Sequence, residues 1–400
     1  MEIICKKCQH ETVLEIAFEV HFFSCPKCKA QFNKKDDLLE FIRISNDSNY
    51  FDAFELGQVA TFNDTRYTIT GIVIKRFNAI TRWAEYILQS QSGEFLYLSE
   101  SDGNFILLEE IDFNQKVGNH PLLIEYQEMT FDRYDYTNPT ISYASGFFDF
   151  DVLTPIELIE YIQPPYILSF EITKQSQTNF YGKHISRSAV KKAFNTSEIP
   201  TKSAVGMVQP FVVNFRNLVI IFGVVAVLIL LSNWYLNKSQ MKQEVLDTSL
   251  AFDQFSGREY VSPSFELKGS SAPMKISLKT DVNNSWANVQ IGLVNEQTGE
   301  ETFASKDIEY YHGYTDGENW TEGDTSEDFN LCGVAAGKYH LTVTPQKAPE
   351  DLNNYGVTIK AVWNEPSSRN VYMTLIFMAI VVFGMYYASK YFEERRWGTN

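Results

Sequence analysis

The chain has 400 residues, 44% of them hydrophobic and 14% aromatic, and its formal net charge is −16. This length predicts two to three domains with enough apolar side chains for packed cores. The negative charge argues against a protein that binds nucleic acid by bulk electrostatic attraction, so no nucleic-acid partner is expected. With 30 Phe and 22 Tyr, the composition favours strands over helices outside any membrane segment.

Four of the five cysteines lie near the N-terminus, as the pairs Cys5/Cys8 and Cys25/Cys28, each with two residues between its members. Two such pairs on tight turns let four sulfur atoms converge on one ion, which predicts a zinc ribbon over residues 1–35. Four thiolates fill a tetrahedral coordination sphere, so we expect a structural Zn²⁺ with no open position for water. Whether the ribbon also binds a partner stays open.

The next segments change from a helical pattern to a series of strands. Asp36–Ile44 has apolar residues at helical spacing, which predicts a short helix. Alternating apolar residues and intervening turns then predict strands and a small β-barrel or curled sheet. The expected strands are Tyr67–Ile74, Trp83–Leu88, Phe95–Leu98 and Phe105–Leu108.

Residues 50–199 resemble the DUF4178 family through a diffuse set of aromatic, leucine and glycine positions. These positions are Leu56, Gly57, Tyr67, Ile69, Gly71, Trp83, Glu85, Tyr86, Leu88, Gly93, Phe95, Tyr97, Leu98, Asp102, Gly103 and Phe105. The resemblance implies a bacterial, often membrane-tethered protein, frequently preceded by a zinc ribbon and without an assigned reaction. Family members encoded near phage-shock-protein-A-like and aminopropyltransferase-like proteins imply such partners and a role in envelope maintenance or membrane stress.

Two features of this unit leave alternatives open. Short echoes between its halves suggest two divergent copies, 50–112 and 118–199. Strand alternation places Trp83 and Glu85 on one face, where they either form a ligand pocket or represent a packed tryptophan with a carboxylate at the rim. We favour the packed tryptophan, because apolar anchors in small barrels are mostly core residues.

Two uncharged segments follow a proline- and glycine-containing linker at 200–216. Residues 217–237 are long enough, at about 1.5 Å per residue, to cross a hydrocarbon layer of roughly 30 Å. Residues 370–389 repeat this pattern and precede a tail at 390–400 that contains three basic residues. Both segments are predicted to be transmembrane helices.

Between these segments, residues 250–365 alternate in a way that predicts a β-sandwich of the jelly-roll or immunoglobulin type. The acidic stretch 310–328 is favoured as a solvated loop, although a Ca²⁺ site or a site for a glycan or cation is conceivable. The residues considered for such a ligand or partner are Tyr311, His312, Asp316, Glu318 and Trp320. Cys332 is expected to be a buried, small hydrophobic residue.

Two spans place the N-terminal unit and the tail on the same side of a membrane. Basic residues near the spans number five on that side and four on the other, which decides nothing. The start of the chain lacks the pattern of a secretory signal, and thiolate ligands need a reducing compartment. We therefore expect both termini in the cytoplasm and the loop 238–369 outside a bacterial inner membrane.

These expectations lead to a functional hypothesis without catalytic or organic cofactor residues. The chain is predicted to be a non-enzymatic scaffold or sensor that links a cytoplasmic ribbon and β unit to an outer sandwich. One alternative is an enzyme or processing factor with its pocket in the loop 310–328 or around Trp83. Another is an oligomeric channel or transporter subunit, and homo-oligomerisation in general stays open.

Overall fold

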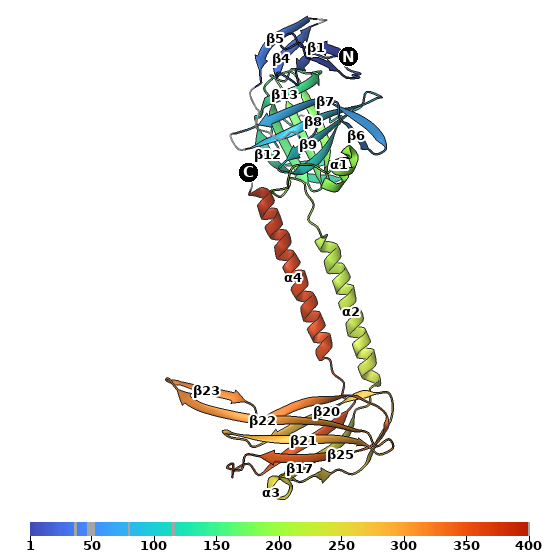
Figure 1. Ribbon diagram of the computed structural model, residues 1–400, viewed down its shortest axis with the longest axis vertical. Helices are drawn as coiled ribbons and strands as arrows, with labels where there is room; N and C mark the ends of the chain where they lie inside the picture. The colour runs from blue at the N-terminus through green and yellow to red at the C-terminus, as the bar shows by residue number, and fades with distance from the viewer. Residues whose placement is uncertain (36–37, 46–52, 79–80, 114–116, 399–400) are drawn as a thin grey trace. The chain divides into compact units, whose positions relative to one another are not determined.

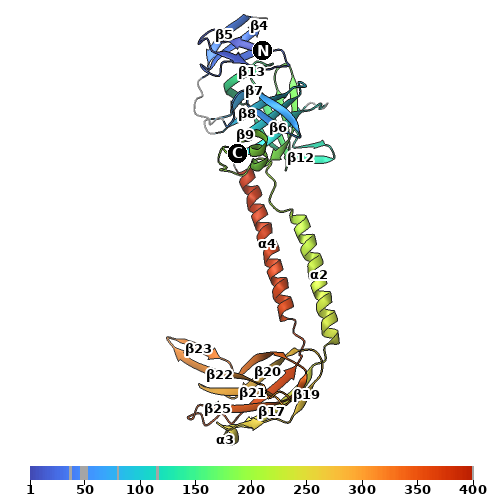
Figure 2. The ribbon, with the colours of Figure 1, turned by 45° about the vertical axis from the view of Figure 1, so that its right-hand side comes forward.

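The structure is a computed structural model that describes residues 1–35, 38–45, 53–78, 81–113 and 117–398. The chain forms two compact units, one of residues Met1–Phe215 with Phe383–Asn400 and one of residues Arg216–Val382. Strands dominate both units, as the composition predicts, and the chain also contains two long helices (Figures 1 and 2).

The N-terminal segment consists of two small antiparallel arrangements. The strands β1 (Glu2–Ile4) and β2 (Glu11–Val13) form a hairpin, and β3 (Phe22–Ser24), β4 (Ala30–Lys35) and β5 (Leu38–Ile44) follow. The helix predicted for residues 36–44 is therefore wrong over the described residues 38–44. These residues pair with β4, where Phe32 lies opposite Phe41. Seven residues are too few to separate helical from strand spacing, and the free edge of β4 supplied backbone partners that no local pattern reveals.

The ribbon strands join a larger sheet that contains most of the first unit. Its order is β11-β12-β14-β15-β16-β10-β9-β8-β7-β13-β3-β4-β5, with β6 paired to β7. The strands not yet given are β6 (Val59–Phe62), β7 (Thr65–Arg76), β8 (Arg82–Ser90), β9 (Phe95–Ser101), β10 (Asn104–Glu110), β11 (Leu123–Tyr126), β12 (Met129–Thr137), β13 (Thr140–Phe148), β14 (Glu157–Gln163), β15 (Tyr166–Ile172) and β16 (Gln177–Ile185).

Of the two forms that the sequence predicts, a small barrel or a curled sheet, the described strands form the curled sheet and do not close into a barrel. Its end strands β11 and β5 have no pairing with each other, and the ribbon strand β3 occupies the free edge of β13. The curl is nevertheless deep, because Lys75 on β7 contacts Glu171 on β15 although β8, β9, β10 and β16 lie between them in the sheet. Two halves of one sheet therefore face each other across an interior.

Apolar clusters cover the outer faces of the two halves. Helix α1 (Arg187–Phe194) packs Val190 and Phe194 against the first half, where the rings of Phe54 and Phe194 stack with their centroids 3.8 Å apart. Ser186 caps this helix by accepting a hydrogen bond from the backbone N–H of Ala189. On the second half, Phe131, Tyr161, Leu168 and Phe170 form a separate core. Burying both outer faces leaves the interior free to hold polar groups.

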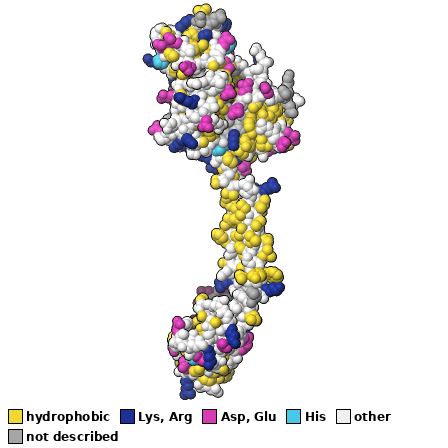
Figure 3. Space-filling view, turned by 90° about the vertical axis from the view of Figure 1, so that its right-hand side faces the viewer, with side chains coloured by type: hydrophobic (Ala, Val, Ile, Leu, Met, Phe, Trp, Pro, Cys, Tyr) yellow, Lys and Arg dark blue, Asp and Glu magenta, His cyan; other side chains and the backbone are white. Residues whose placement is uncertain are grey.

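The two long helices correspond to the uncharged segments of the sequence. They are α2 (Phe215–Ser239) and α4 (Arg369–Trp397), with mean hydropathies of 2.4 and 2.0 in their most apolar parts. None of the residues in those parts is buried, and Figure 3 shows hydrophobic side chains covering the helix surfaces. Both helices are long and apolar enough to cross a membrane.

The second unit contains two sheets that enclose one core. The orders are β17-β26-β20-β24 and β18-β25-β21-β22-β23, with β19 paired to β25. Inward residues of both sheets, such as Ile276 and Ile359 from one and Ile291 and Leu341 from the other, belong to the same buried cluster. The elements are β17 (Gln243–Ala251), α3 (Phe252–Phe255), β18 (Tyr260–Val261), β19 (Phe265–Leu267), β20 (Ala272–Thr280), β21 (Ser285–Asn295), β22 (Glu301–Thr315), β23 (Glu318–Gly323), β24 (Ser326–Val334), β25 (Gly337–Lys347) and β26 (Gly356–Trp363).

Candidate functional site

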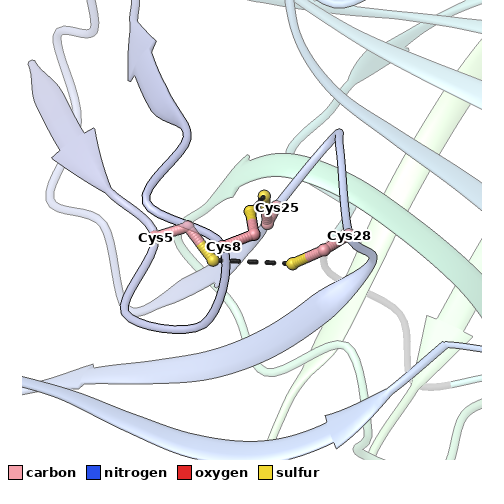
Figure 4. A group of neighbouring side chains, drawn as sticks. All are labelled: Cys5, Cys8, Cys25 and Cys28. Atoms are coloured by element: carbon pink, nitrogen blue, oxygen red, sulfur yellow. Dashed lines mark hydrogen bonds between the residues drawn. The ribbon is translucent and has the colours of Figure 1, made fainter.

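The four N-terminal cysteines converge as their spacing predicts. The Sγ atoms of Cys5, Cys8, Cys25 and Cys28 all lie within 4.8 Å of one another (Figure 4). Those of Cys5 and Cys28 are 3.6 Å apart, and those of Cys8 and Cys25 are 3.7 Å apart. Metal–sulfur bonds of about 2.3 Å in a tetrahedron require sulfur separations of about 3.8 Å, so the observed set fits one metal ion.

The same turn positions both cysteine pairs. The backbone N–H of Gln9 donates to the carbonyl of Cys5, and the N–H of Lys29 donates to the carbonyl of Cys25, each at 2.9 Å. Gln9 and Lys29 both have left-handed backbone conformations, with φ of 59° and 57°. Each turn therefore presents its two sulfur atoms in the same way, and strand pairing brings the two turns together.

The protein surroundings shift the pKa values of Cys8, Cys25 and Cys28 in different directions. The backbone N–H of His10 lowers the pKa of Cys8 to about 7. Burial raises the pKa of Cys25 to about 12 and also raises that of Cys28. Buried thiols of this kind become stable thiolates when a bound cation supplies the missing positive charge.

A second cluster of ionisable groups lies in the interior of the curled sheet. The side chain of Lys75 is only 4% exposed, and its Nζ is 2.8 Å from Oε2 of Glu85 and in direct contact with Oε1 of Glu171. The two carboxylates hold the lysine in its charged form, so its pKa is raised despite its burial. Single removal of a partner from such a buried pair leaves an uncompensated charge.

Trp83 and Glu85 share one face of β8, as the alternation predicts. The indole Nε1–H of Trp83 donates to Oε1 of Glu85 at 2.8 Å. Glu85 is mostly buried and paired with Lys75, which differs from the rim carboxylate that the favoured interpretation expected. Trp83 also lines a cavity of about 930 Å³ in the first unit. Trp83 thus combines a hydrogen bond to a mostly buried carboxylate with a position on the cavity wall.

Sequence reasoning missed Lys75, Glu171, Glu160 and Asp135. The sequence does contain a hint of the buried lysine. Val73 and Lys75 are two residues apart at the end of an apolar strand, so both side chains point to the same face, which is the inward one. The partner Glu171 is 96 residues away in the chain. No local pattern could connect the two, because their contact depends on the curl of the whole sheet.

The residues considered in the outer loop lie on a hairpin of β22 and β23 and are not gathered at one point. Tyr311 and Trp320 share one face, because Trp320 pairs with Gly313 in the register. His312 points to the other face, where its Nε2 lies 2.8 Å from Oδ1 of Asn283. Asp316 is in the turn, and Glu318 starts β23.

The acidic stretch has basic partners from neighbouring strands, which its sequence does not show. Lys275 pairs with Asp328 at 2.9 Å, and Lys306 pairs with Glu327 at 3.0 Å. Within the described parts of the chain, the four cysteines are the one group of three or more metal-ligating side chains that converges. The expectation for Cys332 is wrong, because it is exposed on β24, with its strand neighbour Leu331 pointing into the core instead.

The comparisons with known proteins agree with one part of this description. A family model described as a domain of unknown function (DUF4178) matches residues 55–187, which confirms the resemblance over that range. No curated protein matches the chain. Among solved structures, the infectious bursal disease virus Gt strain gives 9% identity over 77% of this chain and 72% of that chain, with a TM-score of 0.19. PNGF-II gives 8% identity over 76% and 68%, with a TM-score of 0.21.

Proposed function

We propose that the chain is a non-enzymatic, two-span protein of the bacterial cytoplasmic membrane. In this proposal it links a cytoplasmic ribbon and β unit to a β-sandwich on the outer side. The observation that carries it is the surface of α2 and α4, which is apolar and entirely unburied in the most hydrophobic parts of both helices. A soluble protein would hide such surfaces in a core, whereas a lipid bilayer covers them directly.

The end of α4 supports a linking role. Arg396 is fully buried in the first unit, where its guanidinium donates to the carbonyls of Gly206, Met207 and Gln209 and pairs with Glu393. The hydroxyl of Tyr134 donates to the carbonyl of Arg396 at 2.9 Å. Residues 206–209, which precede α2, are thus fixed to the last turn of α4. We call this set of contacts the Arg396 clamp.

The predicted linker at 200–216 is accordingly packed over part of its length. Val208 is 1% exposed, and the amide of Asn104 donates to the carbonyl of Ala204 at 3.2 Å. A movement of α4 would therefore be transmitted to the soluble unit through these packed residues and not through a flexible linker. A scaffold or sensor that works across a membrane requires such a connection.

In this proposal the metal of the ribbon is Zn²⁺ and its role is structural. Four thiolates leave no open coordination position, and soft sulfur ligands in a tetrahedron favour zinc. Thiolate ligands also favour the reducing cytoplasm for this unit. Partners are proposed to be membrane-associated proteins of envelope maintenance, such as phage-shock-protein-A-like or aminopropyltransferase-like proteins.

Fusion reporters test the topology. Alkaline phosphatase fused after residue 237 should be active, because it folds only outside the cytoplasm, whereas a fluorescent protein fused at the C-terminus should fluoresce. Phosphatase activity at the C-terminus would overturn the arrangement. Purification of the full chain in mild detergent, followed by mass spectrometry, then identifies partners, and the proposal requires membrane-associated proteins among them.

A further inference from the structure

The cavity beside Trp83 is open to solvent on one side and is lined by both halves of the curled sheet. Its walls come from β8, β9 and β10 on one side, β12, β14 and β16 on the other, and the packed segment 199–208. A volume of about 930 Å³ is in the range of small-molecule sites in proteins. The cavity lies in one compact unit and does not depend on how the two units are arranged.

The charges on the walls are mostly negative. Four acidic side chains line the cavity, those of Glu100, Asp102, Asp135 and Glu160. The part of the lining that the structure describes contains one arginine, Arg82, and no lysine. His184 also lines it, and burial together with Lys202 and Arg396 lowers the pKa of this imidazole, so it adds no positive charge at neutral pH. A space of this size with excess carboxylates favours a cationic occupant.

Three of the four carboxylates accept a hydrogen bond from the protein. Glu100 accepts a hydrogen bond from the backbone N–H of Gly103 at 2.8 Å, and Asp102 accepts one from the hydroxyl of Ser203 at 3.2 Å. Oδ1 of Asp135 accepts one from the backbone N–H of Tyr136 at 2.8 Å, which leaves Oδ2 for a ligand, and Asp135 lies opposite Glu160 on the paired strands β12 and β14. Among the described residues, Glu160 has no hydrogen-bond partner.

The positive charge of Lys75 acts on Glu160, but this lysine is already paired with Glu85 and Glu171. Burial and the neighbouring charge of Asp135 raise the pKa of Glu160 to about 8. A ligand that brings a positive charge into contact with this buried carboxyl group stabilises its ionised form.

The walls favour an organic cation over a metal ion. Trp83, Tyr134 and Phe77 line the same cavity and offer aromatic faces to an ammonium group and apolar contact to its carbon chain. A metal site would require more oxygen ligands at one point. In the described residues no third His, Cys, Asp or Glu converges with Asp135 and Glu160.

We propose that this cavity binds a small organic molecule with a primary ammonium group. Asp135 and Glu160 bind the ammonium group, and Trp83 and Tyr134 contact the carbon skeleton. Because Tyr134 also belongs to the Arg396 clamp, the ligand would lie against the residues that hold the end of α4. The proposal concerns the soluble unit and stands or falls independently of the membrane topology.

Calorimetric titration of the full chain in detergent micelles tests it, with n-butylamine, phenethylamine and 1,5-diaminopentane as probes and 1-butanol as the uncharged control. The wild type should bind at least one amine saturably and should not bind 1-butanol. Glu160→Gln and Asp135→Asn should each weaken that binding by about 10- to 100-fold, because each removes one charge-assisted contact. Glu125→Gln is the matched control, since Glu125 is an exposed carboxylate on β11 of the same sheet.

Thermal melting of each variant shows whether it is folded. Because two cavity variants are made, the test still works if one of them does not fold. Absence of saturable binding of all three amines to the folded wild type would overturn the proposal. So would equal binding by Glu160→Gln and wild type, or binding of 1-butanol as strong as that of n-butylamine. Competition by MgCl₂ or CaCl₂ at equimolar concentration would assign the site to a metal ion instead.

Discussion

The Nζ of Lys75 on β7 lies 2.8 Å from Oε2 of Glu85 on β8, inside a curled sheet that excludes most water from the pair. The same ammonium group reaches Glu171 on β15, so one lysine connects the two facing halves of the sheet. Apolar side chains alone could not form an ion pair or hydrogen bond of defined geometry between the two halves. The ion cluster therefore fixes how the halves face each other.

Replacement of Lys75 by Met should destabilise the first unit by about 3–5 kcal/mol, because two buried carboxylates lose their counter-ion. For a unit of this size, the thermal midpoint should fall by roughly 6–20 °C. Melting of the full chain in detergent, followed by near-ultraviolet circular dichroism, measures the change. Lys174→Met is the matched control, since Lys174 is exposed, and its midpoint should stay within about 2 °C of the wild type. Equal midpoints for the two variants would contradict a stabilising role for the cluster.

Glu160 makes the stability of the unit depend on pH. Burial is the main cause of its raised pKa of about 8, and Asp135, Glu85 and Glu171 add negative charge from β12, β8 and β15, which Lys75 on β7 partly offsets. A raised pKa means that the folded state binds the proton more tightly than the unfolded state does. This contribution to stability is complete below pH 4.5 and is lost as the pH rises towards 8.

Glu160→Gln should remove this dependence, because the amide is neutral at every pH. Relative to wild type, the variant should change stability little at pH 4.5 and should gain more than about 1.4 kcal/mol at pH 8, the equivalent of one pKa unit. Denaturant titration at a series of pH values measures the difference. A constant difference from pH 4.5 to pH 8 would show that Glu160 has an ordinary pKa.

The four-cysteine site should contain one Zn²⁺ per chain. Cys25→Ser should abolish stoichiometric zinc, because this buried sulfur is one corner of the tetrahedron, whereas Cys332→Ser should keep it. Elemental analysis of the purified full chain measures the metal. Metal-free wild type, or full zinc content in Cys25→Ser, would count against the assignment.

Loss of the metal should also loosen the joint between ribbon and sheet. The strand β3 pairs with β13, and the adjacent Phe22 and Phe23 are fully buried in two different clusters. Removal of zinc by a chelator should therefore unfold this turn locally and let trypsin cleave after Lys27 and Lys29. The wild type with zinc should resist cleavage at these two lysines, and readdition of zinc should restore that resistance.

Local patterns in the sequence predicted those features that depend on short spacing. The cysteine pairs need only two residues between ligands, and α2 and α4 need only an uncharged run, so both were found. The strand β5 was mistaken for a helix because its partner β4 decided its conformation. A small barrel or a curled sheet was expected, and the described strands form a curled sheet that does not close, with the ribbon strand β3 paired to the edge of β13. A local sequence pattern cannot predict a contact between distant segments, and the ion cluster around Lys75 is such a contact.

The Arg396 clamp joins segments that are far apart in the chain, since Arg396 lies 190 residues from Gly206 and 262 residues from Tyr134. Arg396→Ala removes the donors for the carbonyls of Gly206, Met207 and Gln209 at once. Buried carbonyls without donors are costly, so the segment 199–209 should leave the sheet and become hydrated. Trypsin should then cleave after Lys202, which is exposed but lies in a packed segment.

The neighbouring Arg395 provides a matched control, because it is exposed on the same helix turn and contacts Tyr391 instead of the segment 199–209. Arg395→Ala should leave the rate of cleavage after Lys202 unchanged, whereas Arg396→Ala should raise it at least about tenfold, which corresponds to a loss of about 1.4 kcal/mol in local stability. Arg396→Lys should give an intermediate rate, since an ammonium group cannot reach three carbonyls in the fixed geometry of a guanidinium. Quantification of the fragment that ends at Lys202 by mass spectrometry distinguishes these outcomes. Equal rates for all three variants would mean that α4 does not hold this segment in place.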